Sequence, residues 1–307
     1  MADFDSEVLV IGGGPAGLSA SLYLARYKRS VTLFDGGQGR SSWAQTAHNY
    51  LGFPGGIEAR ELRRLGRAQL AEYDHVTIVD DTRIREMAHA DGGFIARANG
   101  GEWRGRAVIL CTGVVDYWPQ FPGWQEYVGV SMFWCITCDG YSSRGMKLVV
   151  VGNTDHAAVT ALQLKRFTDD VTIITNQAEC HISTDEQERL ARGGIPLIHD
   201  SIFSAEGENG QFRLLLTSSG STIPLDRLFN QQGARPLVQL ALDLGVALDE
   251  NGYICVDSEQ KTNVPGVYAA GDVDGLHSHQ VTTAVHEGAQ AASAANYYLY
   301  PPDLKHD

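Results

Sequence analysis

The sequence predicts an α/β protein with two doubly wound, three-layer domains, the second of which is inserted into the first. Three observations lead to this fold class: a strand–helix–strand pattern over residues 7–35, a second one over 147–175, and a final strand and helix after residue 265. Strands that are apolar along their whole length are typical of parallel sheets covered by helices. Their alternation with helical segments predicts crossover connections rather than hairpins.

The first pattern begins with the apolar residues 7–11 (EVLVI), which are rich in β-branched side chains and predict a strand. Glycines follow, and residues 15–27 place Ala and Leu at helical spacing. Residues 30–34 (SVTLF) predict the next strand, which ends at Asp35. The whole stretch has the length of one parallel crossover unit.

The second pattern repeats this order in the middle of the chain. Residues 148–151 (LVVV) predict a strand, Gly152 opens the turn, and residues 157–167 have helical spacing. Residues 171–175 (VTIIT) predict the strand that follows. The repetition indicates a second domain of the same type.

The remaining segments indicate how the domains are connected. Residues 107–113 (AVILCTG) predict a strand between the two patterns, and residues 266–272 (GVYAAGD) predict a late strand followed by a helix over 281–299. The simplest arrangement returns this last strand and helix to the first domain. The expected domains are 1–115 with 246–307 and, inserted between them, 116–245.

Composition limits the classes of function. The chain has 307 residues, of which 34 are glycine, a formal net charge of −13, 43% hydrophobic residues and no low-complexity run, which excludes a disordered protein. The acidic charge and the lack of a Lys/Arg cluster argue against nucleic-acid binding, which depends on neutralising phosphates. No segment has the roughly 18 consecutive apolar residues of a membrane span, and the acidic start does not resemble a secretory signal. We expect a cytoplasmic protein that binds neither nucleic acid nor membranes.

Gly12, Gly14 and Gly17 form a Gly-x-Gly-x-x-Gly motif between a strand and a helix, which is the position that a dinucleotide-binding turn requires. Gly12 permits the tight turn, Gly14 lets the backbone approach a pyrophosphate, and Gly17 lets helix and strand pack closely. Pro15 and Ala16 open the helix, whose N-terminus offers N–H groups and a positive dipole to the phosphates.

Two carboxylates follow predicted strands near this turn. Asp35 ends the second strand and can accept hydrogen bonds from a ribose diol. Gly271 and Asp272 follow the late strand, where an acid can bind a ribityl hydroxyl or reach a phosphate through water. An ordinary turn aspartate remains the alternative for Asp272, and a glycine-rich turn without a ligand remains the alternative for the motif.

Cys135 and Cys138 form a Cys-x-x-Cys motif, the spacing of a redox-active disulfide whose surroundings can lower a thiol pKa. Asp139 follows directly and is a candidate proton donor or acceptor for thiolate exchange. Structural zinc, which usually takes four ligands, is one alternative, although no second cysteine pair exists; inert buried thiols are another. We expect no metal site. The other cysteines are single, which favours small core residues: Cys111, Cys180 and Cys255.

Taken together, these motifs resemble the low-molecular-weight thioredoxin reductase family of flavoproteins. The most specific is the Cys-x-x-Cys-Asp-Gly in the inserted domain. The resemblance implies two Rossmann-like nucleotide-binding domains. The matching stretches follow the expected order over nearly the whole chain: VLVIGGGPAGLSASLYLAR (8–26), HNYLGFPGG (48–56), AVILCTG (107–113), WCITCDGY (134–141) and TNVPGVYAAGDV (262–273).

The resemblance further implies FAD as the cofactor of the first domain and a thioredoxin-like protein or another disulfide as the substrate. It implies that Cys138 faces the flavin, that Cys135 attacks the outside disulfide and that Asp139 acts as the acid. Members of this family are homodimers, so we expect a homodimer here. The residues implied to contact FAD are Gly12, Gly14, Pro15, Ala16, Gly17, Asp35, Asn49, Thr112, Gly113, Gly271, Asp272 and Gln280.

The second turn departs from the family pattern. NADPH-dependent members carry Gly-x-Gly-x-x-Ala there, whereas residues 152–157 of this chain read GNTDHA, and the side chain of Thr154 would crowd a pyrophosphate. After the next strand, residues 175–181 contain no Arg or Lys to hold the 2′-phosphate of NADPH, and Glu179 would oppose it. The sequence therefore predicts a member of the family that does not use NADPH.

The sequence leaves the electron donor open, with reduced ferredoxin and another flavin as the candidates. Three alternatives for the function also remain: a dithiol oxidase that uses O₂ on a small dithiol, an NADPH-dependent reductase with a degenerate site, and a non-catalytic redox sensor. Four arginines on one predicted helix would either receive an acidic ferredoxin or form a solvated helix face. They are Arg60, Arg63, Arg64 and Arg67.

Overall fold

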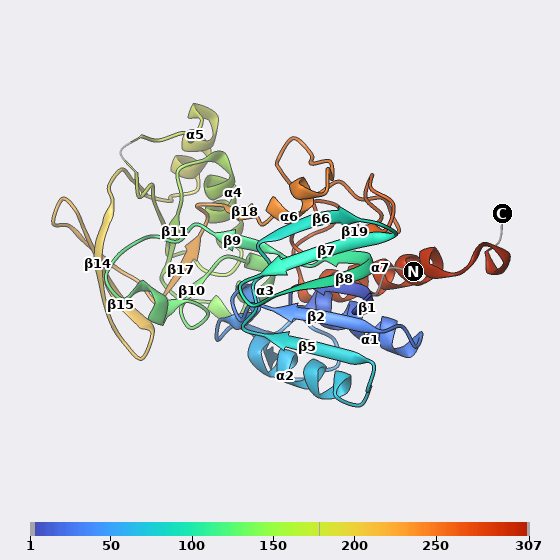
Figure 1. Cartoon of the computed structure of the whole chain (residues 1–307). Coiled ribbons are helices and arrows are strands. Elements are labelled where there is room, and N and C mark those ends of the chain that lie inside the picture. Colours follow the sequence, from blue (N-terminus) through green and yellow to red (C-terminus); the bar gives the residue numbers. More distant parts are fainter. Residues whose placement is uncertain (1–3, 178, 306–307) are drawn as a thin grey trace. The chain divides into compact units, whose positions relative to one another are not determined.

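A computed structural model describes residues 4–177 and 179–305 of the chain (Figure 1). Contacts between Cα atoms divide the chain into two compact units. Unit 1 consists of Met1–Ser42, Glu58–Val115 and Arg235–Asp307, and unit 2 consists of Trp43–Ile57 and Asp116–Ala234. Residues 235–245, which we expected in the insert, thus belong to unit 1, and residues 43–57 belong to unit 2.

Unit 1 is built on a mixed sheet. Its strands are β1 (Ser6–Ile11), β2 (Val31–Asp35), β5 (Val76–Asp80), β6 (Glu86–Ala90), β7 (Gly93–Ala98), β8 (Gly101–Leu110) and β19 (Val267–Ala269). The strand order is β5-β2-β1-β8-β7-β6, and β19 also pairs with β8. β5, β2, β1, β8 and β19 pair in parallel, whereas β7 pairs antiparallel with both β6 and β8.

Helices cover this sheet and position the glycine-rich turn. They are α1 (Pro15–Arg26), α2 (Ala59–Leu70), α6 (Gln239–Asp243) and α7 (Val281–Leu299), with the 3-10 turns η1 (Arg40–Ser42) and η4 (Pro302–Leu304). α1 and α7 approach closely because Gly288 has no side chain: a Cβ there would lie 2.2 Å from the Ala16 carbonyl oxygen. The two helices share one apolar core with β1 and β8, and α6 packs in the core on the other face of the sheet.

Unit 2 contains a second parallel sheet, with the order β10-β17-β11-β12-β13. Its strands are β10 (Met132–Phe133), β11 (Leu148–Val151), β12 (Val171–Ile174), β13 (Leu197–Ile198) and β17 (Arg227–Asn230). Helices α4 (Asp155–Leu164) and α5 (Thr184–Arg192) pack on one face. The other face packs against an antiparallel sheet of β14 (Ile202–Glu208), β15 (Gln211–Thr217) and β16 (Thr222–Pro224).

Short elements connect these sheets. β3 (Thr46–Ala47) pairs with β4 (Ile57–Glu58), and β9 (Val114–Asp116) pairs with β18 (Ala234–Pro236). In unit 2, η2 (Trp124–Tyr127) precedes β10, and α3 (Ile136–Asp139) and η3 (Tyr141–Ser143) follow it. The Cys-x-x-Cys motif therefore lies where the chain leaves β10.

The predicted α/β fold class is confirmed, since both glycine-rich turns join a buried parallel strand to a helix. The predicted helix over 281–299 is α7 itself. α4 begins two residues before its predicted start because its first turn contains the polar residues Asp155 and His156, which the spacing of apolar residues cannot detect.

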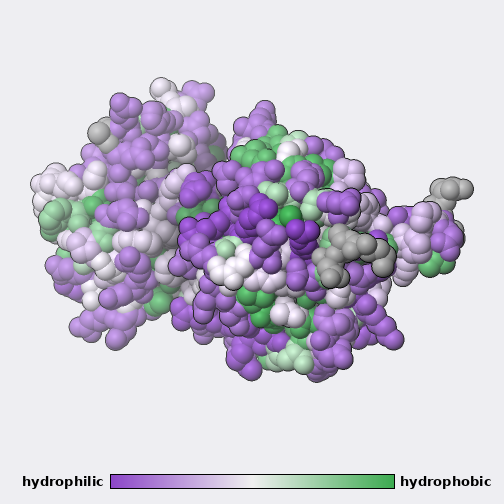
Figure 2. Space-filling model, viewed as in Figure 1, coloured by the Kyte–Doolittle hydropathy of each residue, from purple (hydrophilic) through white to green (hydrophobic). Residues whose placement is uncertain are grey.

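Hydrophilic side chains cover much of the visible surface of each unit (Figure 2). No helix within residues 4–177 and 179–305 is long and apolar enough to cross a membrane. The acidic start of the chain, on which the expectation of no secretory signal depends, lies partly outside the described residues, which begin at Phe4.

Candidate functional site

The glycine-rich turn of unit 1 joins β1 to α1 and has one open side. A Cβ at Gly12 would lie 2.1 Å from the Cys111 carbonyl oxygen, and a Cβ at Gly17 would lie 1.8 Å from the Gly12 carbonyl oxygen. At Gly14, by contrast, the nearest described atom is Ser41 Oγ at 3.7 Å. The first and third glycines therefore pack the turn, and the second leaves room at the N-terminus of a helix, where a pyrophosphate binds.

Asp35, at the end of β2, is 5% exposed and already has several partners. Its Oδ1 accepts the Gly37 N–H at 2.9 Å, while its Oδ2 accepts from Arg63 at 2.6 Å and from Arg67 at 3.2 Å. A carboxylate offers about four acceptor positions. A position remains on Oδ1, and the contact of Asp35 with a ribose diol stays a prediction.

The four arginines of α2 line a cavity of about 310 Å³ together with Asp35, Asp80 and Asp81. They are engaged with their own chain. Arg67 also binds Asp80 at 2.7 Å, Arg64 binds Glu61 at 2.7 Å, and Arg60 donates to the Ser42 carbonyl oxygen at 2.8 Å. This helix face is therefore a set of ion pairs, which gives little support to its interpretation as a ferredoxin-binding patch.

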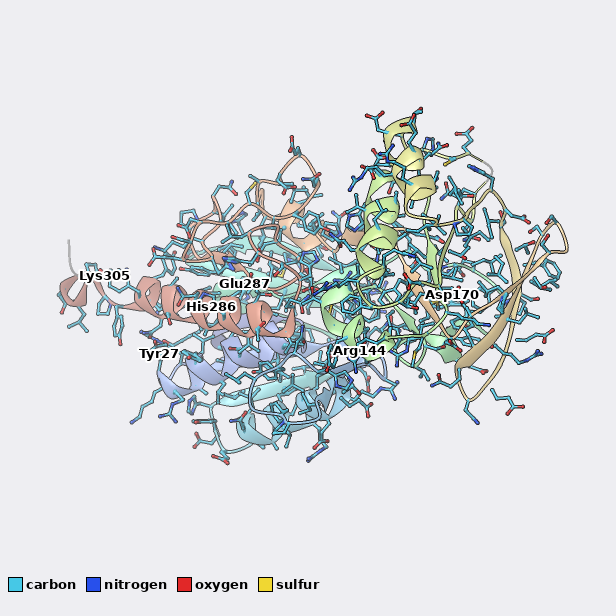
Figure 3. All side chains as sticks on the ribbon, turned by 180° about the vertical axis from the view of Figure 1, so that it is seen from behind. Tyr27, Arg144, Asp170, His286, Glu287 and Lys305 are labelled. Atoms are coloured by element: carbon cyan, nitrogen blue, oxygen red, sulfur yellow. A yellow bond between two sulfur atoms is a disulfide. The ribbon has the colours of Figure 1, made fainter. Side chains whose placement is uncertain are left out.

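The turn that follows β19 is held by two residues that the sequence analysis missed. Arg40 Nη1 lies 2.7 Å from Asp272 Oδ2, and both side chains are about one-fifth exposed. Glu287 of α7 is buried and accepts the Gly271 N–H at 2.7 Å and a hydrogen bond from His277 Nδ1 at 2.9 Å. Figure 3 labels Glu287 on α7. Two features of the sequence could have identified these residues: Arg40 is a single arginine in a Gly/Ser-rich segment, and Glu287 is a single acid in an Ala-rich helix.

Asp274 lies beside this turn and is 1% exposed. Burial and the nearby Glu287 carboxylate raise its pKa to about 7. Burial also raises the pKa of the Cys111 thiol, again with a contribution from these two acids. This end of unit 1 therefore concentrates negative charge, for which Arg40 is a counter-charge.

The other predicted cofactor residues have varied environments. Thr112 donates to the Leu237 carbonyl oxygen at 2.7 Å, and Gly113 has φ +66°. Gln280 is the N-cap of α7, where its side chain and that of Thr283 form a capping box. Asn49 is exposed and lies in unit 2. All of the predicted cofactor residues except Asn49 thus belong to unit 1, and the contact of each with FAD stays a prediction.

Unit 1 fits a dinucleotide such as FAD because the turn is open where phosphates would approach. The N-terminus of α1 carries no acidic residue in its first turn. Helix N–H groups there, with Arg40 nearby on η1, would bind the phosphates, and Asp35 would bind the ribose. The resemblance had not named Arg40 among the cofactor residues.

The redox motif lies in unit 2, where Cys135 and Cys138 form a disulfide. Cys135 is the N-cap of α3, and its Sγ accepts the Cys138 N–H at 3.0 Å. The spacing of the motif therefore places both sulfurs on one helical turn. Within the described residues, no group of three or more His, Cys, Asp or Glu side chains could hold a metal ion.

Asp139 ends α3 and is 3% exposed, which makes it the buried acid of the redox motif. Gln45 Nε2 donates to its Oδ2 at 3.1 Å. Burial raises the pKa of Asp139 to about 7, while the hydrogen bond from Gln45 and the charge of Arg227 act in the opposite direction. A carboxyl group with such a pKa can both give and take a proton near neutral pH.

The glycine-rich turn of unit 2, between β11 and α4, is crossed by its own chain. The His181 N–H donates to the Asn153 carbonyl oxygen at 2.8 Å, and Asn153 Nδ2 donates to Gln177 Oε1 at 2.6 Å. Thr154 and His181 form a β-bridge, and the Ser183 N–H donates to Asp155 Oδ1 at 2.6 Å. We call residues 176–183, without the undescribed residue 178, the crossing loop.

The charges around this second turn are unfavourable for phosphates. Asp155 lies in the first turn of α4. Glu179 belongs to the crossing loop, where His181 Nε2 lies 3.8 Å from its carboxylate. Residues 152–157 and 175–183 contain no Arg or Lys.

The single cysteines divide into different environments. Cys111 is buried, as predicted, and Cys180 is partly buried against the core of unit 2. The prediction is wrong for Cys255, which is exposed. Its neighbour Ile254 is 2% exposed, so the side chains alternate along this extended segment and Cys255 points outward.

A family model described as pyridine nucleotide-disulphide oxidoreductase matches residues 6–288 of the chain. Among curated proteins, a thioredoxin reductase of Listeria monocytogenes is 30% identical over 305 residues, which cover 95% of this chain and 93% of the relative.

Solved structures give the same result. A thioredoxin reductase from Streptococcus pyogenes superposes with a TM-score of 0.88 at 26% identity and covers 96% of this chain and 98% of that one. An atypical thioredoxin reductase, TRi from Desulfovibrio vulgaris Hildenborough, is 36% identical with a TM-score of 0.53 and covers 95% of this chain and 97% of that one.

Proposed function

Because the chain belongs to the pyridine nucleotide-disulphide oxidoreductase family and is a thioredoxin reductase-like, FAD-dependent enzyme, we propose that it reduces disulfides without taking electrons from NADPH. Its substrate is a thioredoxin-like protein or another disulfide. The observation that carries the proposal is the second glycine-rich turn, where Thr154, the crossing loop and Asp155 occupy or oppose the place of a pyrophosphate.

The chemistry at the redox motif follows from its residues. A bound FAD, once reduced by the electron donor, would supply the electron pair that, with two protons, converts the Cys135–Cys138 disulfide into two thiols. The Cys135 thiolate attacks the disulfide of the substrate and forms a mixed disulfide, and one substrate thiolate leaves. Cys138 then attacks Cys135, which restores the disulfide and releases the second substrate thiolate. Asp139 gives and takes protons at these sulfurs.

Electrostatics at the second turn support the exclusion of NADPH. Each charge-assisted contact to a phosphate contributes about 1.5–3 kcal/mol, and residues 152–157 and 175–183 offer no arginine or lysine for it. NADH lacks the 2′-phosphate but still needs the space that Thr154 and the loop occupy. The electron pair must therefore come from another low-potential carrier, either a reduced ferredoxin or a second flavin. The ion-paired arginines of α2 do not indicate where such a carrier binds.

Anaerobic stopped-flow mixing of the FAD-loaded protein tests the proposal. NADPH or NADH should leave the flavin absorbance unchanged over seconds, whereas a dithionite-reduced ferredoxin should bleach it. The disulfide of a thioredoxin should then restore the absorbance of wild type but not of Cys135→Ser.

Rapid bleaching by NADPH would refute the proposal in favour of an NADPH-dependent reductase. Peroxide formation on adding a small dithiol in air, without turnover of a thioredoxin disulfide, would instead identify a dithiol oxidase. Full electron transfer to a disulfide by Cys135→Ser would indicate a redox sensor in which the motif is not catalytic. A homodimer and a cytoplasmic location stay predictions, and light scattering measures the first.

A further inference from the structure

The backbone of Asp139 is held by a small set of polar groups in unit 2. Its backbone carbonyl accepts from the hydroxyls of Ser142 and Ser143 at 3.1 and 2.7 Å. Arg227 Nη1 donates to the same two hydroxyls at 3.1 and 2.9 Å, and its guanidinium lies 5.1 Å from the centre of the Phe133 ring. These contacts fix the backbone of Asp139 but do not touch its carboxylate.

Gln45 contacts the carboxylate itself, through the hydrogen bond from Nε2 to Oδ2 at 3.1 Å. It lies 94 positions earlier in the chain, in the segment Trp43–Ile57 that accompanies unit 2. An uncharged donor on one oxygen of a buried acid favours the ionised form and fixes the orientation of the group.

The position of Gln45 is itself fixed on both sides. Its backbone lies against Gly129, where a Cβ would be 2.8 Å from the Gln45 nitrogen, and Gly129 has φ +77°. Two residues earlier, the Trp43 ring lies 6.2 Å from Trp118 and 6.1 Å from Trp124, measured between ring centres. A glycine and a tryptophan cluster thus hold the segment before β3 that carries this amide to the redox motif.

We propose that Gln45 is a positioning residue of the redox motif: its amide holds the Asp139 carboxylate and sets the pH at which that group exchanges protons with the cysteine sulfurs. The inference rests on the proposed role of Asp139. Other groups act around it. The charge of Arg227, the first residue of β17, lowers the pKa of Asp139 and so opposes the effect of burial. The charge of Asp226, which precedes β17, raises the pKa of Arg227. Among the described residues, η3 contributes only the uncharged Ser142 and Ser143 to this contact set.

Infrared titration of the FAD-loaded protein reads the Asp139 carboxyl directly, because its protonated C=O band disappears on ionisation and is absent from Asp139→Asn. In Gln45→Met, which keeps the length of the side chain but removes the donor, the midpoint should rise by about one pH unit or more. In Gln45→Glu the two acids would share a proton, and the midpoint should rise further. Gln125→Met changes an exposed glutamine of η2 and should leave the midpoint unchanged.

The same variants are followed kinetically, by reoxidation of the photoreduced protein with a disulfide at each pH. If the kinetic midpoint moves with the infrared midpoint, both the inference and the role of Asp139 stand. An infrared midpoint that moves alone would refute the role of Asp139 but support Gln45 as its partner. An unchanged infrared midpoint in Gln45→Met, with Trp fluorescence like that of wild type, would overturn the inference.

Discussion

The glycine-rich turns of the two units start from the same pattern and end as different surfaces. Both follow a buried parallel strand, and both first glycines pack against backbone: a Cβ at Gly12 would meet Cys111, and one at Gly152 would lie 2.7 Å from the Gln231 carbonyl oxygen. The second position differs. A Cβ at Gly14 would meet only Ser41 Oγ, at an ordinary contact distance of 3.7 Å, whereas Thr154 pairs with His181 of the crossing loop.

This comparison separates what a turn needs to fold from what it needs to bind. The first glycine is required by close backbone contacts in both units, so its presence indicates only a strand–helix turn. The space at the second position and the charges around it decide whether phosphates can approach. α1 has no acid in its first turn, while α4 has Asp155. A glycine motif is therefore evidence for a fold, and its surroundings are evidence for a ligand.

The largest effect is expected from filling the open position of unit 1. Gly14→Val should weaken FAD binding by about 100-fold or more, because two lost phosphate contacts of about 1.5 kcal/mol each correspond to that factor. Gly14 has φ −79°, which valine adopts, so the FAD-free protein should still fold. Flavin content after gel filtration and circular dichroism measure the two outcomes.

Thr154→Val is the matched change in unit 2 and should leave the flavin content at the wild-type value. If Gly14→Val retained its flavin, or if Thr154→Val lost it, the distinction between an open and a closed turn would be wrong.

A smaller effect is expected at Arg40, which faces the acidic turn of the same site. Arg40→Gln should weaken FAD binding by about tenfold, because one charge-assisted contact of about 1.5 kcal/mol is lost and Asp272 is left without its partner. The affinity of the FAD-free protein for added FAD, measured from flavin fluorescence at several salt concentrations, gives the change and its electrostatic part.

Arg26→Gln, on the last turn of α1, serves as the control and should leave the affinity unchanged. An Arg40→Gln protein with wild-type affinity and wild-type salt dependence would show that Arg40 serves the fold of the turn alone.

The sequence predicted the parts of the molecule that depend on local pattern. Apolar runs identified β1, β2, β11 and β12, and helical spacing identified α7, because burial imposes these periods on neighbouring residues. The glycine, cysteine and acidic positions of the two motifs were found because their chemistry requires particular residues at a fixed local spacing.

Contacts between distant residues left no such pattern. Arg40 and Asp272 are 232 positions apart, and Gln45 and Asp139 are 94 apart. The local sequence around Arg40 or Gln45 does not indicate its partner, because only folding brings the two residues of each pair together. The sequence likewise did not predict that the crossing loop packs over the turn, although it did show that the loop contains no arginine. Arg63 and Arg67, which looked like a free basic face, bind Asp35 instead.

The last prediction concerns the stability of the protein and Asp274, an acid that is buried near the turn of unit 1. The pKa of Asp274 is raised to about 7 in the folded protein, above its value of about 3.9 in an unfolded chain. Folding therefore favours the protonated form. The stability that this proton contributes is complete below about pH 4 and is lost as the pH rises to about 7.

Asp274→Asn cannot ionise and should escape this loss. Its thermal midpoint should exceed that of wild type at pH 8 by several degrees, since a pKa shift of about three units corresponds to at most about 4 kcal/mol, and the advantage should shrink steadily as the pH falls toward 4. Asp303→Asn, which changes an exposed acid of η4, should show no such trend. If the advantage of Asp274→Asn did not vary with pH, packing rather than the buried charge would be its cause. Asp274 would then not differ in its electrostatics from Asp155, the exposed acid in the first turn of α4.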